Sequence, residues 1–291
     1  MKTFSPIAAA VLLAVSGTAF AAGNTAMQTQ NGFLNQATAN QAGPATFFNT
    51  IIQDQDGLLN HADATQSVQL LSTIYQKQDG AFNDAYALQS FGAFNNSSSY
   101  QYGVGNHSST VQIAQLGSSA STTQVLFFNK SDILQLAGAF NSATVYQVGL
   151  GNYQLTAQVG SIASKANTTQ VGIGNIAATG QSGFAQDSDI MQVGLVNIAG
   201  VEQAGAFNSS KVMQNGIVNL AGVVQVGEFN HQTTNQWGIL NGAATLQVGL
   251  GHNSTTMQAG LLNGHLTTQT GAFETAVATQ TGVLNVGVIM Q

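Results

Sequence analysis

The chain has 291 residues, of which only 5% are charged, and its formal net charge at pH 7 is −6. It holds five lysines, no arginine and no cysteine. So few basic residues exclude a nucleic-acid-binding patch, and the lack of cysteine excludes disulfides, thiolate metal sites and cysteine nucleophiles.

Residues 1–21 have the pattern of a secretory signal peptide. Lys2 provides a short positive start, an uncharged apolar stretch runs from Ile7 to Val15, and the small residues Ala19 and Ala21 match a cleavage site. The apolar stretch is too short to span a membrane, and the remaining alternative is a buried N-terminal helix. We therefore expect a secreted chain that is not membrane-spanning, with one repeat domain over residues 22–291.

The rest of the chain is a repeat of eleven or twelve residues. Glutamine recurs at Gln170, Gln181, Gln192, Gln203, Gln214, Gln225, Gln236, Gln247, Gln258, Gln269, Gln280 and Gln291. Two residues after a glutamine stand Gly172, Gly183, Gly194, Gly205, Gly216, Gly227, Gly238, Gly249, Gly260, Gly271 and Gly282. Five residues after a glutamine stand Asn175, Asn197, Asn208, Asn219, Asn230, Asn241, Asn263 and Asn285. Between Gln66 and Gln181 the glutamine spacing alternates between 12 and 11, which indicates that two arcs form one structural unit.

Each arc has the period of a β-strand. Asn197, Ala199, Val201 and Gln203 share one face of an extended chain, and the same face carries Asn, small, β-branched and Gln residues in the other arcs. The Gly-x-x-Asn segment predicts a turn in which Gly takes a positive φ and Asn tolerates one. Twenty-four glutamine anchors then mark twenty-four strands. The predicted fold class is all-β: a parallel β-solenoid with two strands per rung and about 12 rungs, about 55 Å long at roughly 4.8 Å per rung.

Stacking in register explains how the interior accommodates so many amides. An unpaired buried amide would cost several kcal/mol, but an amide stacked on its copies donates to one neighbour and accepts from the other. We expect such ladders at Gln192, Gln214, Gln236, Gln258 and Gln280. A slip of one residue would expose them all, so the ladders also fix the register.

The repeat Gln-x-Gly-x-x-Asn-x-Ala-x-x-x-Gln resembles the curlin repeat of curli fibre subunits. Residues 170–181 and 192–203 match every fixed position, and the resemblance covers essentially all of the chain after the signal segment. It implies a secreted subunit that polymerises into extracellular amyloid fibres on the cell surface, serving adhesion and the biofilm matrix. It also implies partners: a nucleator subunit and an outer-membrane secretion pore. Both the major subunit and the nucleator are compatible with the repeat.

Other function classes fit the residues less well. Asp54, Asp56, Asp63, Asp79 and Asp84 crowd the first rungs with only Lys77 nearby, so we expect them on outer or turn positions that discourage aggregation. No catalytic, cofactor-binding or metal-binding residue is predicted. His61 and His107 occupy equivalent places two rungs apart, too far to share an ion. An ice-binding solenoid is the alternative from another class, but the outward residues before the anchors do not form a regular Thr array.

The sequence also singles out the C-terminal edge and the turns. Val288 and Ile289 lie in an uncharged last strand, which we expect to template the first rung of another copy, head to tail. One two-arc step from Asn230 reaches His252 and the next reaches Glu274, so these two are expected to be adjacent and to share a charge-assisted hydrogen bond. Phenylalanine precedes many turn asparagines, and it either fills the turn edge or forms an outward aromatic ladder.

Overall fold

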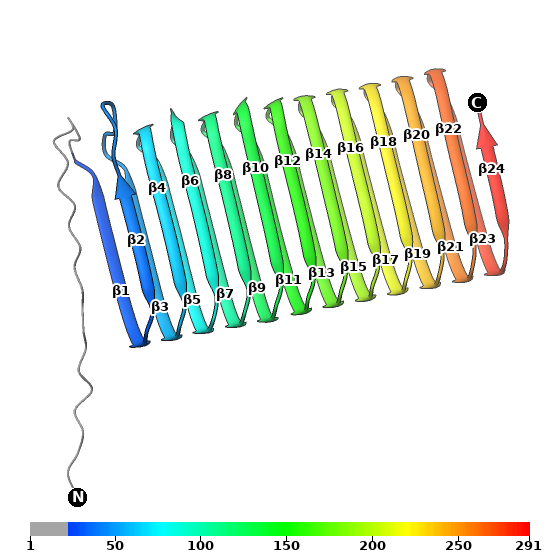
Figure 1. Cartoon of the computed structure of the whole chain (residues 1–291). Helices are drawn as coiled ribbons and strands as arrows, with labels where there is room; N and C mark the ends of the chain where they lie inside the picture. The colour runs from blue at the N-terminus through cyan, green and yellow to red at the C-terminus, as the bar shows by residue number, and fades with distance from the viewer. Residues whose placement is uncertain (1–22) are drawn as a thin grey trace, which may run out of the picture.

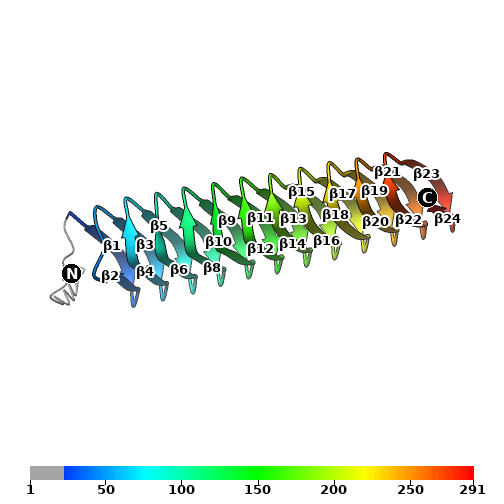
Figure 2. The same ribbon diagram turned by 90° about the horizontal axis from the view of Figure 1, so that it is seen from above.

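Each arc of the repeat forms one β-strand, and successive strands alternate between two parallel sheets that lie against each other along the whole stack (Figure 1, Figure 2). The computed structural model describes residues 23–291, so the predicted signal peptide, with Ala19 and Ala21, lies outside the described residues.

The odd sheet consists of β1 (Thr25–Phe33), β3 (Thr50–Leu58), β5 (Thr73–Ala81), β7 (Asn96–Val104), β9 (Ser119–Phe127), β11 (Ser142–Leu150), β13 (Lys165–Ile173), β15 (Asp187–Leu195), β17 (Ser209–Ile217), β19 (His231–Ile239), β21 (Asn253–Leu261) and β23 (Thr275–Val283). The even sheet consists of β2 (Gln36–Gln41), β4 (His61–Leu70), β6 (Asp84–Ala93), β8 (His107–Leu116), β10 (Lys130–Ala139), β12 (Tyr153–Ile162), β14 (Ile176–Phe184), β16 (Ile198–Ala206), β18 (Leu220–Glu228), β20 (Gly242–Leu250), β22 (Gly264–Ala272) and β24 (Val286–Met290).

Neighbouring strands within each sheet are parallel and in register. Gln55 pairs with Gln78, and Gln192 pairs with Gln214, so each anchor glutamine lies beside the anchor of the next rung. Two sheets of 12 strands each give twelve rungs, which confirms the predicted parallel β-solenoid. Among residues 23–291 no helix is long and apolar enough to cross a membrane.

The alternation of longer and shorter arcs has a local cause in the even sheet. Strands β4, β6, β8, β10 and β12 are each one residue longer than the odd strands that precede them. The additional residue follows the anchor glutamine, where Val68 and Phe91 take positive φ angles of 52° and 54°, as in a bulge. The wider corner is filled by polar side chains such as Gln69, which accepts a 2.9 Å hydrogen bond from the Ser72 hydroxyl. From β14 to β23 all strands have the same length and lack the addition.

The interior between the sheets is narrow. In the middle rungs it is filled by buried alanine, valine and isoleucine, for example Ile190, Val201 and Val212. In the first rungs Gln53 and Gln76 occupy the place of these aliphatic residues, and both are buried. Their amide groups donate to backbone carbonyls of the facing strands at 2.8 and 3.0 Å. Burial of these polar groups is therefore offset by hydrogen bonds across the stack.

The turns correct one sequence-based expectation. The repeat glycines do take positive φ, as expected: Gly194 has φ 125°, and a Cβ there would overlap the carbonyl oxygen of Gly216 on the next rung. The turn asparagines of the described chain, however, do not take positive φ. That conformation falls on the apolar residue just before them, such as Phe207 (φ 56°) and Val218 (φ 57°). The reason is that Asn points inward, where its amide is buried and hydrogen-bonded, and the preceding residue must then reverse the chain.

Candidate functional site

The two anchor-glutamine ladders run through all twelve rungs without a gap. One joins Gln30 to Gln280 and the other joins Gln41 to Gln291, each through eleven amide–amide hydrogen bonds of 2.7–3.1 Å. The expected ladder of Gln192, Gln214, Gln236, Gln258 and Gln280 is therefore present. Its members are buried except at the last rung.

Every amide in these ladders points the same way along the stack. Gln192 donates from Nε2 to Gln214 Oε1 at 2.8 Å on the next rung, and it donates its second hydrogen to the Ile176 carbonyl of the facing sheet at 2.9 Å. Reversing the amide would place its oxygen against that carbonyl oxygen, so the facing strand fixes the orientation. Each buried Gln thus uses both donors, and the ladder has a donor end and an acceptor end.

The asparagine ladder at the corners between strands has a different geometry. Asn219 donates its backbone N–H to Asn197 Oδ1 at 3.0 Å, and its Nδ2 donates to the Gly238 carbonyl at 3.2 Å on the following rung. The same pattern places Asn175, Asn241 and Asn263 at buried corners. The predicted turn glycines, among them Gly172, Gly194 and Gly238, adjoin these corners and supply the carbonyl acceptors.

The last rung leaves the donor end of both glutamine ladders open. Gln280 and Gln291 each donate one hydrogen to a backbone carbonyl of the facing sheet, Gly264 and Thr275 respectively. At the opposite end, within residues 23–291, no donor reaches Oε1 of Gln30, and Oε1 of Gln41 likewise receives none. The two ends of the described stack are therefore chemically complementary: amide donors at one and amide acceptors at the other.

The two predicted edge residues lie on opposite faces of β24. Ile289 points toward the interior between the sheets, whereas Val288 points outward and is 58% exposed. Ile289, Ala278 and Gly287 line a hollow at this end of the stack, because small side chains occupy most of the interior of the last rung. Of the two, only Ile289 is thus in a position to pack against the interior of another rung.

His252 and Glu274 are adjacent, as the two-arc step predicts. The His252 side chain is buried, and its Nδ1 lies 3.4 Å from Glu274 Oε2. Neither atom has a hydrogen-bond partner, so the predicted adjacency is confirmed but the expected hydrogen bond is not formed. The other ring nitrogen, Nε2, lies 3.1 Å from the Val248 carbonyl. Glu274 belongs to the last rung, so its carboxylate borders the open end of the stack.

A cluster that was not predicted from the sequence lies on the outer face of the even sheet. Asp84 accepts hydrogen bonds from Nδ1 of both His107 (3.1 Å) and His61 (2.9 Å), one on each side. The hydrogen bond from His107, together with that from His61, lowers the pKa of Asp84 against the opposing effect of burial. The two histidines are two rungs apart, as predicted, but the rung between them carries their shared partner. The residues described contain no group of three or more side chains able to hold a metal ion.

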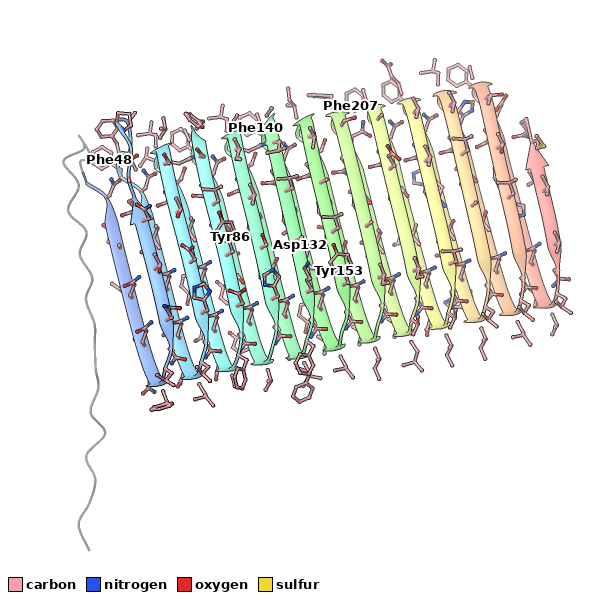
Figure 3. All side chains as sticks on the ribbon, viewed as in Figure 1. Phe48, Tyr86, Asp132, Phe140, Tyr153 and Phe207 are labelled. Atoms are coloured by element: carbon pink, nitrogen blue, oxygen red, sulfur yellow. The ribbon has the colours of Figure 1, made fainter. Side chains whose placement is uncertain are left out.

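Other charged side chains also lie on outer faces, as predicted for the aspartates of the first rungs. Lys77 is 3.9 Å from Asp54, and Lys130 is 3.3 Å from Asp132 on its own strand. Figure 3 shows Asp132 on the broad face of the even sheet. These pairs are partly exposed to solvent, so they contribute little to stability and keep the outer faces solvated.

The phenylalanines before the turn asparagines point outward. Phe140 and Phe207 project from one edge of the solenoid (Figure 3), and Phe273 is 75% exposed. Phe207 stacks on Phe229 with ring centroids 4.9 Å apart and meets Phe184 edge to face at 5.2 Å. The outward orientation is therefore the one observed, and the turn edge of the interior is filled by the asparagines instead. In the described chain the rings contact one another at Phe184, Phe207 and Phe229, whereas Gly105 and Gly117 interrupt the aromatic column on earlier rungs.

Comparison with known proteins identifies no related family or protein. No protein-family profile matches the chain, and no curated protein matches it at a significant level.

Proposed function

We propose that the chain is a secreted structural subunit that stacks head to tail into extracellular curli-type amyloid fibres for adhesion and biofilm matrix. The observation that carries this proposal is the complementarity of the two end rungs. The predicted signal peptide, the curlin-like repeat and the low charge support the extracellular setting. A nucleator subunit of the same fibres fits the repeat as well.

The first and last rungs match in sequence as well as in hydrogen bonding. If one copy continues the stack of another, residues 25–41 lie over residues 275–291. Eight of these 17 positions are then identical: Thr, Ala, Thr, Gln, Gly, Leu, Asn and Gln. Gln30 lies over Gln280 and Gln41 over Gln291. The junction then repeats the contacts between two rungs of one chain.

The junction also has a defined polarity. Gln280 and Gln291 present free amide hydrogens, and Gln30 and Gln41 of the next copy present the acceptors. A head-to-head contact would bring donors against donors and leave four amides unpaired, each at about 1–3 kcal/mol. A head-to-tail stack forms the bonds and buries Ile289 as well, so it is the favoured arrangement.

Seeded elongation of two single variants tests the proposal. Ile289→Lys places a charge between the sheets at the growing end, and we expect it to slow elongation strongly. Val277→Lys places the same charge in the last rung but on the outer face of the odd sheet, and we expect elongation close to that of the unmodified chain. Fibres of the unmodified chain should show the cross-β spacing of about 4.7–4.8 Å. Equal elongation by both variants, or no seeded growth of the unmodified chain, would refute head-to-tail stacking.

A further inference from the structure

The outer face of the even sheet has a pattern that head-to-tail stacking does not use. Its first two outward columns are called column 1 and column 2: column 1 follows the turn asparagine directly, and column 2 lies two residues later on each strand. From β14 to β22 these columns are apolar. Ile176, Ile198 and Leu220 form a ridge in column 1, and each is at least 38% exposed.

Column 2 forms a groove beside this ridge. Its floor consists of Ala178, Gly200, Gly222 and Ala244, and Leu155 and Leu266 stand in the same column beyond its ends. Gly200 and Gly222 have ordinary backbone angles, and a Cβ at either would meet nothing within 4 Å. Neither the turn geometry nor close packing within the chain therefore requires these glycines. What these two glycines determine is the shape of the outer surface, where they keep the floor of the groove open.

We propose that this face binds a second copy of the chain, with the two solenoids parallel and related by a two-fold axis along their length. The proposal deepens the proposed function, because it describes how two stacked filaments would pair. A two-fold axis midway between the columns brings column 1 of one copy against column 2 of the other at the same rung. Large side chains then face small ones: Ile198 faces Gly200, and Leu220 faces Gly222.

The same two-fold rotation also brings a large side chain against a small one on β22, where the large residue is in column 2 and not in column 1. On β22 the small residue, Gly264, is in column 1 and the large one, Leu266, is in column 2. The pairing therefore places Leu266 of each copy over Gly264 of the other. Such alternation of ridge and groove gives the dry, interdigitated contact of a steric zipper.

Charges are complementary in the other half of the face. On β10, Lys130 is in column 1 and Asp132 in column 2, so each lysine would face the other copy's aspartate. On β4, His61 and Asp63 are arranged in the same way. Tyr86 would face the carboxylate of Asp84. Figure 3 shows Tyr86, Asp132 and Tyr153 on this face. On any one rung of the described chain, no like charges face each other across the axis in these columns.

The area is sufficient for a specific contact. Eleven rung spacings of about 4.8 Å give a length of about 53 Å, and two columns about 7 Å apart cover a width of about 14 Å. Each copy would bury about 700 Å², close to the roughly 800 Å² per partner of a standard interface. The opposite face offers no equivalent, since the same two columns on β17 carry Ser209 and Lys211.

Disulfide trapping tests the pairing directly, because the chain has no cysteine of its own. One variant carries Gly264→Cys and another Leu266→Cys. We expect cross-linked dimers in fibres grown from a mixture of the two and few in fibres of either variant alone. Asn253→Cys and Thr255→Cys occupy the corresponding columns of β21 on the opposite sheet, and this control mixture should not cross-link. Equal cross-linking within the single variants and in their mixture would overturn the parallel two-fold arrangement.

Mass per length of the fibres gives a second measurement. Paired filaments contain two chains for each set of twelve rungs, or about 58 Å, and single filaments contain one. Gly222→Lys blocks the groove without a clash within the chain, so we expect it to halve the mass per length while seeded growth continues. Thr233→Lys on the opposite sheet should leave it unchanged.

The outcomes separate this inference from the proposed function. Fibres of the unmodified chain that contain one copy for each set of twelve rungs would overturn the pairing and leave head-to-tail stacking intact. If such single filaments bind thioflavin T and Gly222→Lys abolishes that binding, the groove is a site for a planar ligand instead. Chains that never elongate refute the proposed function, and the cross-link pattern of the soluble chains then decides the pairing alone.

Discussion

Replacing one ladder glutamine by leucine should lower the free energy of unfolding, because the lost hydrogen bonds cost more than the burial of the leucine contributes. Gln236 donates to Gln258 Oε1 at 2.8 Å and to the Leu220 carbonyl at 2.9 Å, and it accepts from Gln214 at 2.8 Å. Gln236→Leu leaves Gln258 Oε1 and one amide hydrogen of Gln214 buried without partners, at about 1–3 kcal/mol each, and it removes the bond to the part-buried Leu220 carbonyl, worth about 1 kcal/mol. A buried leucine offsets about 1.5–3 kcal/mol of that loss. The expected net loss is about 3 kcal/mol.

Urea unfolding of freshly prepared soluble chain, followed by circular dichroism, measures this loss. Thr233→Leu is the matched control, since it makes the same kind of change on the same strand but on the outer face, where changes stay within about 0.5 kcal/mol. If Gln236→Leu lowers the free energy of unfolding by less than about 1 kcal/mol, the amide ladders do not stabilise the fold in the way the hydrogen bonds indicate.

Three further expectations concern glycine, pH and the aromatic edge. Gly216→Ala should destabilise by several kcal/mol in urea unfolding, because φ is 136° and a Cβ would overlap the glycine carbonyl of the next rung, whereas Gly222→Ala should be neutral or slightly stabilising. Because the pKa of Asp84 is lowered in the folded chain, this residue stabilises the fold at pH values above its ordinary pKa of 3.8, and the stabilisation is lost as the pH falls through the lower folded-state pKa. Asp84→Asn should flatten that part of the pH–stability profile. Phe207→Ala removes a stack with Phe229 at a half-exposed edge, so a loss of only about 1 kcal/mol is expected in thermal unfolding.

The period of the repeat was sufficient to predict the stack. The two-arc spacing fixes which side chains lie one rung apart, so the glutamine ladders and the His252–Glu274 contact followed from counting alone. The same count applied to His61 reaches Asp84 and then His107, and the signal for that cluster was therefore present in the sequence. The informative residue is Asp84, on the rung between the two histidines, and the cluster is overlooked when only the two histidines are considered.

Contacts between the two sheets could not be predicted in the same way. The carbonyl of Ile176 accepts from Gln192 because of how far one sheet is offset against the other, and no spacing within a strand contains that offset. The positive φ of Val218 has a similar origin. A β-branched residue disfavours this conformation, and it is imposed here by the inward-pointing asparagine that follows.

The rung-by-rung pairing has a kinetic consequence. Each strand pairs only with the strands of the rungs just before and after it, so closing one rung onto the next joins parts of the chain that are a single two-arc repeat apart. The entropy lost in closing such a loop is small and nearly the same at every step. Folding can therefore advance along the chain as a one-dimensional front that starts from any formed rung. An existing solenoid end presents the surface that such a front needs, and an arriving chain would wind onto it without first completing a fold of its own.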